Sequence, residues 1–486
     1  MKLKNRFILA ALVAAMGLTA NAGWVYKRTG TNDKGVEVGV LSDDNWSFGV
    51  TRKNGTNELT VDCSLEGFEC RATEPCPIDF STGITDSEGI KYQVVAYKRV
   101  SSSNMTAECL AKISKFIAKD CKSLGVHGVG YDFNGASNLQ KVEFNDDLVI
   151  EKGGYIFQNC VALKDFSPRT IRFSTDVGYL FNGCKNLGGD FEIYEKTFVC
   201  NGMFKGTLVG KVTALNATTI GEYAFQDCCN FSNLVTNCKV DSIGRLAFSN
   251  CPKIDMEFVT KMLHKELKRL GNEKTGAGER QGVFSGCTGI EGELVWNLPQ
   301  IDTNIVPNIC FKNCTNITKV IFKTPIDEMR VEAFLNLKEG AEIYLPTQVP
   351  SSFGRSAVGN CRIKQNKDDT IATRWPKVYL SAETKDEWLT VMGQNNCVIR
   401  KENFNAPNEQ LAEGTPPRNW HNANTRATAV EIMAMDTDVC KLEDNKVTVY
   451  DRNVIGFVFL KKNSAYEYYG CWVMKQPEDG FKVIVR

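Results

Sequence analysis

Residues 220–228 read Ile220-Gly-Glu-Tyr-Ala-Phe225-Gln-Asp-Cys228, and the second half of this phrase keeps returning along the chain. An aromatic residue, two small or polar residues and a cysteine recur from Phe157 to Cys160, Phe181 to Cys184, Phe225 to Cys228, Phe248 to Cys251, Phe284 to Cys287 and Phe311 to Cys314. Degenerate copies without the cysteine begin at Phe133, Phe204 and Phe334. The nine phenylalanines follow one another at steps of 24, 24, 23, 21, 23, 36, 27 and 23 residues. A nearly constant period in the twenties predicts a solenoid of stacked repeats.

Each repeat has a second part, a short apolar run that alternates with polar residues and therefore indicates a strand. Clear examples are Leu139-Gln-Lys-Val-Glu-Phe144 and Ile317-Thr-Lys-Val-Ile-Phe322. A single unit of this size cannot bury its own apolar face, so neighbouring units must stack. Their strands would pair in parallel at about 4.8 Å per layer, with Phe, Leu and Ile filling the space behind them. The sequence therefore predicts a β-rich solenoid.

The order strand, Ile-Gly-x-x-Ala-Phe, x-x-Cys, x-x-Leu resembles the BspA-like leucine-rich repeat, a family of secreted and surface-exposed repeat proteins. The resemblance runs from Phe133 to about Pro346. The copy at Phe204 lacks the cysteine, and the copy at Phe334 lacks both the cysteine and the usual turn. The resemblance implies a curved parallel sheet with short helices and turns behind it, and a binding role. It supplies no catalytic residue.

Residues 1–22 have the pattern of a secretory signal peptide. Three cations within the first six residues precede the apolar run from Phe7 to Leu18, and Ala20-Asn-Ala22 is a small-x-small cleavage site. We therefore expect a secreted or cell-surface protein without an integral membrane segment after cleavage. Removal of the three cations takes the formal net charge from +1 to −2. A nearly neutral protein has no electrostatic reason to bind nucleic acid or an anionic membrane.

The remaining chain divides into four predicted parts. Residues 23–105 form an N-terminal β-rich cap, because the first layer of a solenoid needs a more polar cover. Within it, Lys53-Asn-Gly-Thr-Asn57 is a hairpin-turn signal. The repeats occupy residues 106–350, and a C-terminal cap with a linker occupies residues 351–427. Residues 428–486 are predicted to form a small antiparallel β region.

Two segments have the spacing of helices. Residues 254–282 carry an apolar stripe from Phe258 to Leu270 that fills the long step of the repeat, and we expect an inserted helix there. It either packs on the convex side in place of a turn or decorates a binding face. Residues 105–124 place Leu110, Ile113 and Phe116 on one helical face, together with Ile117.

All 19 cysteines lie beyond the signal peptide. The repeat cysteines occur at one structural position, so we expect them to stack as buried free thiols that behave as small apolar groups. Nine others lie before and after the repeats, and some of them are expected to pair, although the connectivity cannot be read from sequence. These are Cys63, Cys70, Cys76, Cys109 and Cys121 on one side and Cys361, Cys397, Cys440 and Cys471 on the other.

No recognisable catalytic, cofactor-binding or metal-binding motif occurs in the sequence. The chain has only three histidines, His127, His264 and His421, and it lacks a Gly-x-Ser-x-Gly elbow and a phosphate-binding glycine loop. Paired Cys-x-x-Cys zinc knuckles are missing as well. Carboxylates are plentiful, but no pair stands out as a glycosidase acid and nucleophile. We therefore predict that the protein is not an enzyme and needs no cofactor or metal.

The leading hypothesis is an exported, non-enzymatic repeat scaffold for adhesion or for binding an extracellular protein or glycan at the cell surface. The alternatives are a secreted hydrolase with the repeats as an accessory module, and a structural envelope spacer. The oligomeric state is left open. The candidate binding face consists of solvent-facing strand positions, namely Gln140, Lys141, Glu143, Thr318 and Lys319.

Overall fold

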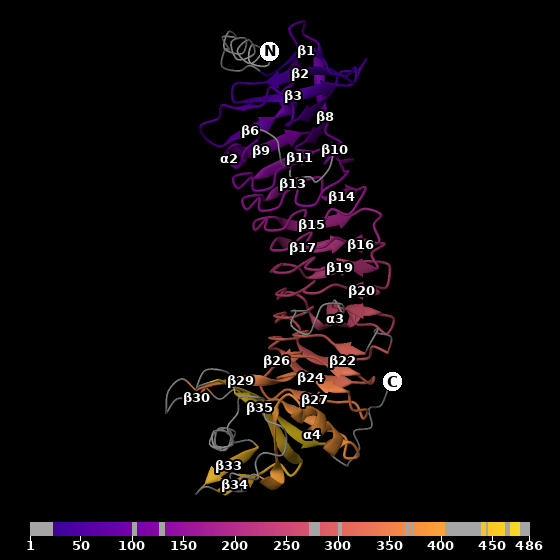
Figure 1. The fold of residues 1–486 in the computed structure, drawn as a ribbon, viewed down its shortest axis with the longest axis vertical. Helices are drawn as coiled ribbons and strands as arrows, with labels where there is room; N and C mark the ends of the chain where they lie inside the picture. The colour runs from indigo at the N-terminus through magenta and orange to yellow at the C-terminus, as the bar shows by residue number, and fades with distance from the viewer. Residues whose placement is uncertain are drawn as a thin grey trace. The chain divides into compact units, whose positions relative to one another are not determined.

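The computed structural model of the chain is drawn in Figure 1. It describes residues 23–99, 105–125, 132–271, 282–299, 304–364, 370–371, 374–403, 439–443, 446–461 and 467–476. The predicted signal peptide lies outside these residues. The chain divides into two compact units. The first contains the residues up to Ala217 with residues 227–230 and 234–237, and the second contains the remainder.

The first unit begins with six strands that close into a ring in the order β8-β4-β3-β2-β1-β7, with β7 paired back to β8. They are β1 (Trp24–Thr31), β2 (Glu37–Ser42), β3 (Trp46–Arg52), β4 (Glu58–Asp62), β7 (Ile84–Thr85) and β8 (Lys91–Lys98). Short β5 (Glu69–Cys70) adds to β3, and η1 (Phe80–Thr82) precedes β7. We call the six-stranded ring the closed sheet. It is mixed, because β4–β8 and β1–β7 are parallel and the other pairs are antiparallel.

Alternating aromatic residues explain why this segment folds as a sheet. Trp24 and Phe48 point to the interior, with ring centroids 5.9 Å apart, and Phe80 lies 4.7 Å from Trp24. The predicted hairpin turn at residues 53–57 is confirmed, because it joins the antiparallel strands β3 and β4. Gly55 makes that turn possible with a φ of +75°, which a residue with a Cβ resists.

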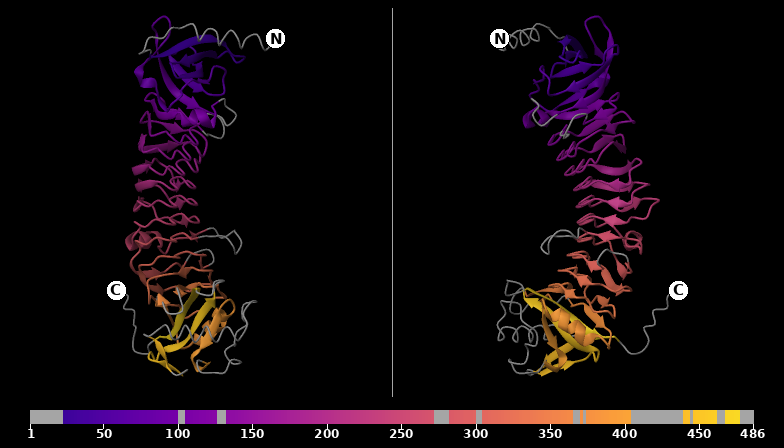
Figure 2. Two further views of the ribbon diagram at one scale, coloured as in Figure 1. Left: turned by 90° about the vertical axis from the view of Figure 1, so that its left-hand side faces the viewer. Right: turned by 45° about the vertical axis from the view of Figure 1, so that its right-hand side comes forward.

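The repeats of the first unit extend the closed sheet from β8. Parallel strands follow in the order β8, β10 (Ser123–Leu124), β12 (Val149–Ile150), β14 (Thr170–Phe173), β15 (Gly188–Ile193) and β17 (Leu208–Thr213). A second parallel sheet contains β6 (Cys76–Asp79), β9 (Ile113–Ala118), β11 (Lys141–Phe144) and β13 (Asp165–Ser167). The unit also contains β16 (Phe198–Val199), and β19 (Asn233–Val235) falls at the division between the units. Both views of Figure 2 show these strands in successive layers.

The helix suggested by the spacing over residues 105–124 is wrong for most of that stretch. Only α2 (Ala107–Ala111) is helical, and β9 and β10 follow it. Ile113, Phe116 and Ala118 are buried, and β9 pairs in parallel with β6 and β11. Pairing on both edges satisfies the backbone of this segment, so tertiary context overrides a spacing that also fits a helix.

The described residues of the second unit form four further groups of paired strands. β18 (Thr219–Ile220), β20 (Ser242–Ile243) and β21 (Arg269–Leu270) are parallel, as are β23 (Ile305–Val306), β25 (Glu328–Met329) and β28 (Ser352–Phe353). The largest sheet has the order β22 (Gly292–Trp296), β24 (Ile317–Phe322), β27 (Glu342–Tyr344), β31 (Lys377–Leu380), β36 (Glu467–Lys475), β29 (Val358–Lys364) and β26 (Phe334–Leu335). β30 (Thr370–Ile371), β32 (Cys397–Arg400) and β35 (Val454–Lys461) join it at the side. The helices are α3 (Met256–Met262), α4 (Lys385–Gly393) and η2 (Lys401–Asn403).

The sequence suggested that the strands of the C-terminal region form a sheet of their own. The two longest of them instead join the largest sheet of the second unit. β36 pairs in parallel with β31 and antiparallel with β29 and β35, so it lies inside the largest sheet of the second unit. Only β33 (Cys440–Glu443) and β34 (Lys446–Val449) form a separate antiparallel pair. Sequence alternation identifies a strand but not its partner, which explains the difference. Most of the predicted linker lies outside the described residues.

The inserted helix is shorter than the predicted 254–282. α3 starts at the N-cap Asp255, whose carboxylate accepts a 2.8 Å hydrogen bond from the backbone N–H of Phe258. It ends at Met262, and Leu270 belongs to β21 instead of the helix. The apolar stripe therefore includes the buried face of α3 and one residue of β21. Over so short a segment, the spacing of apolar residues does not distinguish a helix from a helix followed by a strand. Residues 272–281 lie outside the described residues.

The twelve repeat side chains of the six Phe-to-Cys phrases are all buried. In the first unit the rings of Phe133, Phe157, Phe181 and Phe204 are stacked with centroids 5.2, 5.8 and 5.8 Å apart. In the second unit the rings of Phe225, Phe248, Phe284, Phe311 and Phe334 are stacked at 5.6, 5.6, 5.4 and 5.5 Å. We call each series a ring stack. The step of 36 residues has the same ring spacing as the shorter steps, so its additional residues leave the stack undisturbed.

Each repeat thiol has the same hydrogen-bond partner. The Sγ atom donates to the carbonyl oxygen of the aromatic residue in the preceding repeat, over 3.1 Å from Cys160 to Phe133 and 2.9 Å from Cys184 to Phe157. The bonds of Cys228, Cys251, Cys287 and Cys314 are 2.8, 2.9, 3.0 and 3.1 Å long. These six cysteines are the thiol ladder. None of the six forms a disulfide, and the bond to the carbonyl explains why a weak donor occupies a buried position.

The residue before each thiol position is left-handed. Its φ lies between 58° and 81° in all nine copies, at Gly135, Asn159, Gly183, Gly206, Asp227, Asn250, Gly286, Asn313 and Asn336. Gly, Asn and Asp tolerate this conformation best, which accounts for the small or polar residue in the phrase. The turn aims the backbone N–H at the next repeat, as in the 2.8 Å bond from Asn159 to the carbonyl of Asn182.

The prediction of a β-rich chain with short helices is confirmed. A wholly parallel sheet does not describe it, because the closed sheet is mixed and the largest sheet of the second unit contains antiparallel pairs.

Candidate binding surfaces

The predicted face residues of the first unit lie on β11 and just before it. Val142 and Phe144 are buried, so Lys141 and Glu143 face outward, and Gln140 is exposed. The Glu143 carboxylate forms 3.0 Å ion pairs with Lys141 and with Lys119 from the neighbouring layer. Hydrogen bonds from these two ammonium groups lower the pKa of Glu143 and outweigh its partial burial. This small cluster of two ammonium groups and one carboxylate keeps one positive charge in excess.

The predicted face residues of the second unit lie on β24. Thr318 is exposed, and the Lys319 ammonium lies 3.4 Å from the Glu293 carboxylate on β22. The same ammonium lies 5.1 Å from the centre of the Tyr344 ring on β27, and that ring stacks on Tyr379 of β31 at 4.6 Å. Side chains on four adjacent strands therefore form one row, which is exposed at Glu293, partly exposed at Lys319 and Tyr344, and buried at Tyr379. We call Glu293, Lys319, Tyr344 and Tyr379 the Lys319 row.

Sequence reasoning found one member of the Lys319 row and missed the other three. The two sets of predicted residues belong to different units, so they make two separate surfaces. Tyr344 and Tyr379 occupy matching positions of paired strands, since they are direct partners in the register of β27 and β31. The sequence shows two predicted strands that both contain Tyr-Leu near their end. Only the pairing of β27 with β31 shows that the two tyrosines are in contact.

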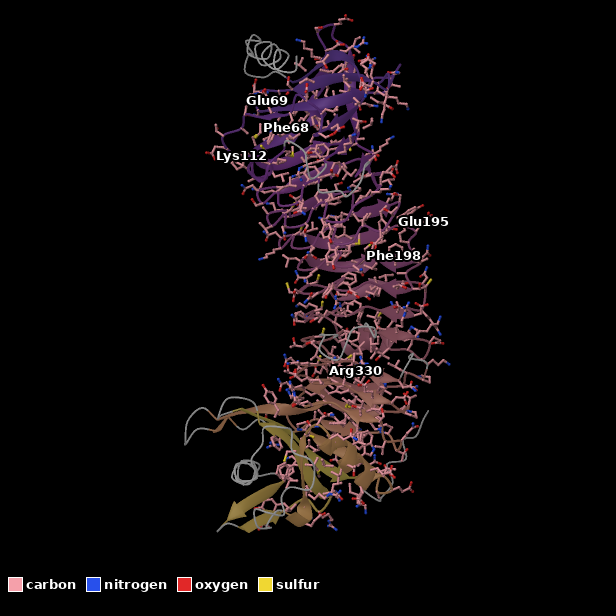
Figure 3. All side chains as sticks on the ribbon, in the orientation of Figure 1. Phe68, Glu69, Lys112, Glu195, Phe198 and Arg330 are labelled. Atoms are coloured by element: carbon pink, nitrogen blue, oxygen red, sulfur yellow. The ribbon has the colours of Figure 1, made fainter. Side chains whose placement is uncertain are left out.

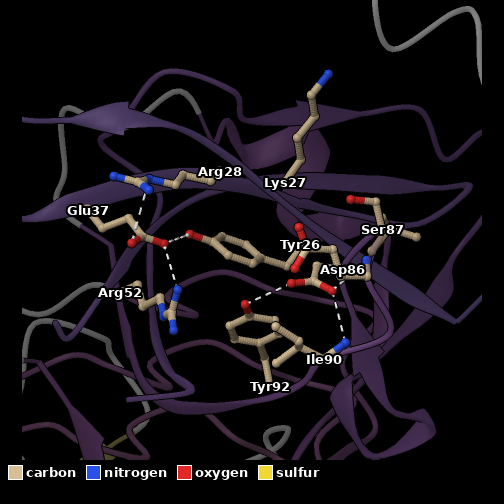
Figure 4. Close-up of a pocket in the computed structure, with 11 residues that line it drawn as sticks. Tyr26, Lys27, Arg28, Glu37, Arg52, Asp86, Ser87, Ile90 and Tyr92 are labelled. Atoms are coloured by element: carbon tan, nitrogen blue, oxygen red, sulfur yellow. Dashed lines mark hydrogen bonds and ion pairs between the residues drawn. The ribbon is translucent and has the colours of Figure 1, made fainter. Parts of the chain in front are cut away.

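A pocket of about 590 Å³ lies on the closed sheet and was not anticipated from the sequence. Figure 4 shows Glu37 at one side of it, where the carboxylate accepts a 2.8 Å hydrogen bond from the Tyr26 hydroxyl. Arg52 donates to the same oxygen over 3.1 Å, and Arg28 lies 3.6 Å from the other oxygen. Burial raises the pKa of Glu37, but the hydrogen bonds from Tyr26 and Arg52 outweigh it and the net pKa is lowered.

Asp86 is the second carboxylate of this pocket. It accepts 2.9 Å hydrogen bonds from the Tyr92 hydroxyl and from the backbone N–H groups of Glu88 and Ile90. The backbone bond from Ile90 and the bond from Tyr92 together outweigh desolvation, so the pKa of Asp86 is lowered. Since the pKa values of both Asp86 and Glu37 are lowered, neither group holds a proton for general acid catalysis at neutral pH. The pocket offers fixed charges and hydroxyl groups.

Within the parts of the chain that the structure describes, no group of three or more His, Cys, Asp and Glu side chains could hold a metal ion. His264 lies in the second unit, where its Nδ1 is 3.1 Å from the Glu266 carboxylate. His127 and His421 are outside the described residues. No helix in the described ranges is long and apolar enough to span a bilayer.

The repeats have a recognisable family. A sequence profile of the BspA type leucine rich repeat region, with 6 copies, matches residues 117–215, 197–265 and 280–372. The chain belongs to the BspA-type leucine-rich repeat proteins. The resemblance seen in the Ile-Gly-x-x-Ala-Phe phrase is thereby confirmed. No curated protein matches the chain.

Solved structures of leucine-rich repeat proteins are similar to parts of this BspA-type protein. A leucine rich repeat protein of T. pallidum is 16% identical, with 47% of this chain and 97% of that protein covered and a TM-score of 0.33. A leucine rich cell surface protein of Faecalibacterium prausnitzii is 16% identical over 60% of this chain and 90% of its own, with a TM-score of 0.29. The pneumococcal vaccine antigen PcpA is 13% identical, with 74% and 96% covered and a TM-score of 0.27. The assignment to the family therefore rests on the repeat profile.

Proposed function

We propose that this BspA-type repeat protein is exported and acts as a non-enzymatic scaffold that binds protein or glycan at the cell surface. In this proposal residues 1–22 are its signal peptide, residues 23–105 and 351–427 cap the repeats, and residues 106–350 form a curved parallel solenoid. The repeat profile supports a binding role, because repeat arrays present extended surfaces on a rigid frame. Such a frame loses little conformational entropy when many side chains bind at once.

The observation that carries the proposal is the Lys319 row. Val320, Ile343 and Val378 are buried beneath the strands that carry the row, so its backbone is fixed by the core. The Tyr344 ring is held between the Lys319 ammonium and the Tyr379 ring. Its hydroxyl donates to Glu342 over 3.0 Å. Together with Glu342, the row therefore presents one cation and two carboxylates that are already ordered, which suits hydroxyl-rich or charged ligands.

Binding screens with the purified protein test this proposal. We expect residues 23–486 to bind a subset of a glycan array or of a panel of extracellular-matrix proteins. Lys319→Glu should weaken that binding at least tenfold, because it places three carboxylates side by side. Lys115→Glu in the first unit is the matched control, since it makes the same charge change at an exposed position of β9, outside the row and outside the predicted binding face.

Two results would reject parts of the proposal. Equal affinity of the Lys319→Glu variant and the wild type would remove the row as the contact surface. Self-association without binding to any glycan or matrix protein would favour the structural spacer over the scaffold.

A further inference from the structure

Three cysteines lie close together in the first unit, outside the thiol ladder. Cys70 ends β5, Cys76 begins β6 and Cys109 lies in α2. None of them belongs to the repeat phrase, and each side chain is partly exposed. The stretch from β5 to β6 therefore meets the start of the repeats at a group of accessible thiols.

Cys70 and Cys109 are neighbours, and after burial the Cys109 thiol is the strongest influence that raises the pKa of Cys70. Cys109 is held in place, because the Thr106 hydroxyl donates to its Sγ over 3.3 Å. Thr106 also caps α2 by accepting a hydrogen bond from the backbone N–H of Cys109. Cys70 is fixed by the pairing of β5 with β3, opposite Trp46. Both thiols are thus positioned by regular structure.

The surrounding backbone keeps the two segments together. The Lys112 ammonium donates to the carbonyl oxygen of Thr73, and the N–H of Cys76 donates to the carbonyl of Lys112 over 2.8 Å. Figure 3 shows Glu69, next to Cys70, and Lys112 on the same side of the first unit. The stretch between Cys70 and Cys76 is therefore held against the C-terminal end of α2 by two independent hydrogen bonds.

A second pair of neighbouring thiols in the first unit lies in a different environment. Burial, followed by the neighbouring Cys184, raises the pKa of Cys160 in the thiol ladder. Both are fully buried, and each Sγ donates to a carbonyl oxygen. Oxidants cannot reach that pair without unfolding of the repeats. Cys70 and Cys109 therefore differ from Cys160 and Cys184 in being accessible to an oxidant.

We propose that Cys70 and Cys109 form a redox-active pair, whose oxidation to a disulfide joins β5 of the closed sheet to α2 at the start of the repeats. The electron acceptor is a disulfide such as oxidised glutathione. The Cys70 thiolate attacks that disulfide, forming a mixed disulfide and releasing one glutathione thiol. Cys109 then attacks the mixed disulfide and releases the second. Two protein thiols become one disulfide, and the acceptor gains the two electrons and two protons.

The proximity of the two thiols also affects their reactivity. Burial, followed by the neighbouring Cys109, raises the pKa of Cys70 to about 11. Since the thiolate is the nucleophile, exchange is expected to speed up as the pH rises from 7 to 9. The new bond closes a loop that runs from residue 70 to residue 109 and restrains the unfolded chain. This inference is independent of the binding role, because it concerns neither the Lys319 row nor a ligand.

Peptide mapping after controlled oxidation tests the proposal. Purified residues 23–486, fully reduced, are incubated with oxidised glutathione, alkylated without denaturant and digested with trypsin and a glutamate-specific protease. This combination separates all five cysteines that precede the repeats. We expect one dominant linked species containing Cys70 and Cys109, and unmodified ladder thiols until the protein is denatured.

Serine variants supply the controls. Cys76→Ser should retain the linked species and the higher melting temperature that accompanies it, whereas Cys70→Ser should lose both. The reduced variants should melt within a few degrees of the reduced wild type, since only partly exposed groups are changed. A dominant link from Cys76 to either partner, or oxidation of Cys160 and Cys184 before Cys70, would overturn the proposal. Separate alkylation of Cys70 and Cys109 after long oxidation would do the same.

Discussion

The ring stacks and the closed sheet solve the same problem of burying polar and apolar groups in different ways. In the stacks, each layer repeats the contacts of the one before it, down to the bond from each ladder thiol to a preceding carbonyl. In and beside the closed sheet, each polar group has its own arrangement, as with Glu37 and the deeply buried Asp132. Periodic parts share their stabilising contacts among layers, and the closed sheet depends on individual ones.

The largest expected effect is in the middle of the second ring stack. Phe248 has stacked neighbours 5.6 Å away on both sides and an edge contact to Phe258 at 5.1 Å. Phe248→Ala should therefore lower the free energy of unfolding by about 3–5 kcal/mol, as for large cavities in cores. Urea unfolding followed by circular dichroism measures this loss. Phe198→Ala, which changes a partly exposed ring, is the control; equal losses would contradict the stacked core.

An intermediate effect is expected beside the closed sheet, at Asp132. Burial raises the pKa of its carboxyl to about 7, and hydrogen bonds from the backbone N–H groups of Arg99 and Gly125 only partly oppose this rise. The charged groups and thiols around it are the Arg99 guanidinium, Tyr97, Cys63 and Cys121. The folded state holds the proton more tightly than the unfolded state does. Its stabilising contribution is therefore complete below about pH 4 and is lost as the pH rises towards 7.

Asp132→Asn removes this titration and keeps an oxygen for the 2.7 Å bond from the backbone N–H of Arg99. We expect the variant to be more stable than the wild type at pH 8 by about 1–3 kcal/mol, the usual cost of a poorly satisfied buried polar group. At pH 4 the two proteins should differ little. Thermal unfolding at intervals from pH 4 to 8 gives the comparison. If the variant is instead less stable than the wild type at pH 8, the negative charge of Asp132 is needed to hold Arg99 in place.

The smallest expected effect distinguishes two adjacent cysteines. Cys228 is a buried rung of the thiol ladder and donates to the carbonyl of Phe204 over 2.8 Å, whereas Cys229 is exposed. Cys228→Ala should cost about 1 kcal/mol through the lost bond and a small cavity. Cys229→Ala should be neutral to within about 0.5 kcal/mol. Chemical denaturation of both variants decides the matter, and similar values would show that the ladder bond contributes nothing.

This contrast also explains what could be predicted from the sequence. The repeat phrase predicts the family and the burial of every Phe in the ring stacks and every Cys in the thiol ladder, because identical residues at a fixed period must occupy equivalent layers. The left-handed residue before each thiol position was visible as Gly, Asn or Asp, although its conformation was not recognised. In the periodic region, the sequence pattern of a repeat also determines its tertiary environment, because its neighbours are copies of the same pattern.

Elsewhere the sequence was less informative. β9 has a spacing that also fits a helix, and only its pairing with β6 and β11 decides between the two. β36 reads as part of a separate small sheet, yet it lies between β31 and β29. The pocket around Glu37 joins residues from different strands of the closed sheet without any common motif. Each of these features depends on which segments pack against each other. Alternation within one strand does not reveal the partner of that strand.

The even ring spacing across the longest step has a meaning for evolution. Phe248 and Phe284 are 5.6 Å apart, like neighbours separated by 23 residues, although the chain between them also makes α3 and β21. Additional sequence has thus been accommodated here without altering the interior. One repeat of this array can accordingly carry a helix and a further strand while the rings on either side keep their spacing.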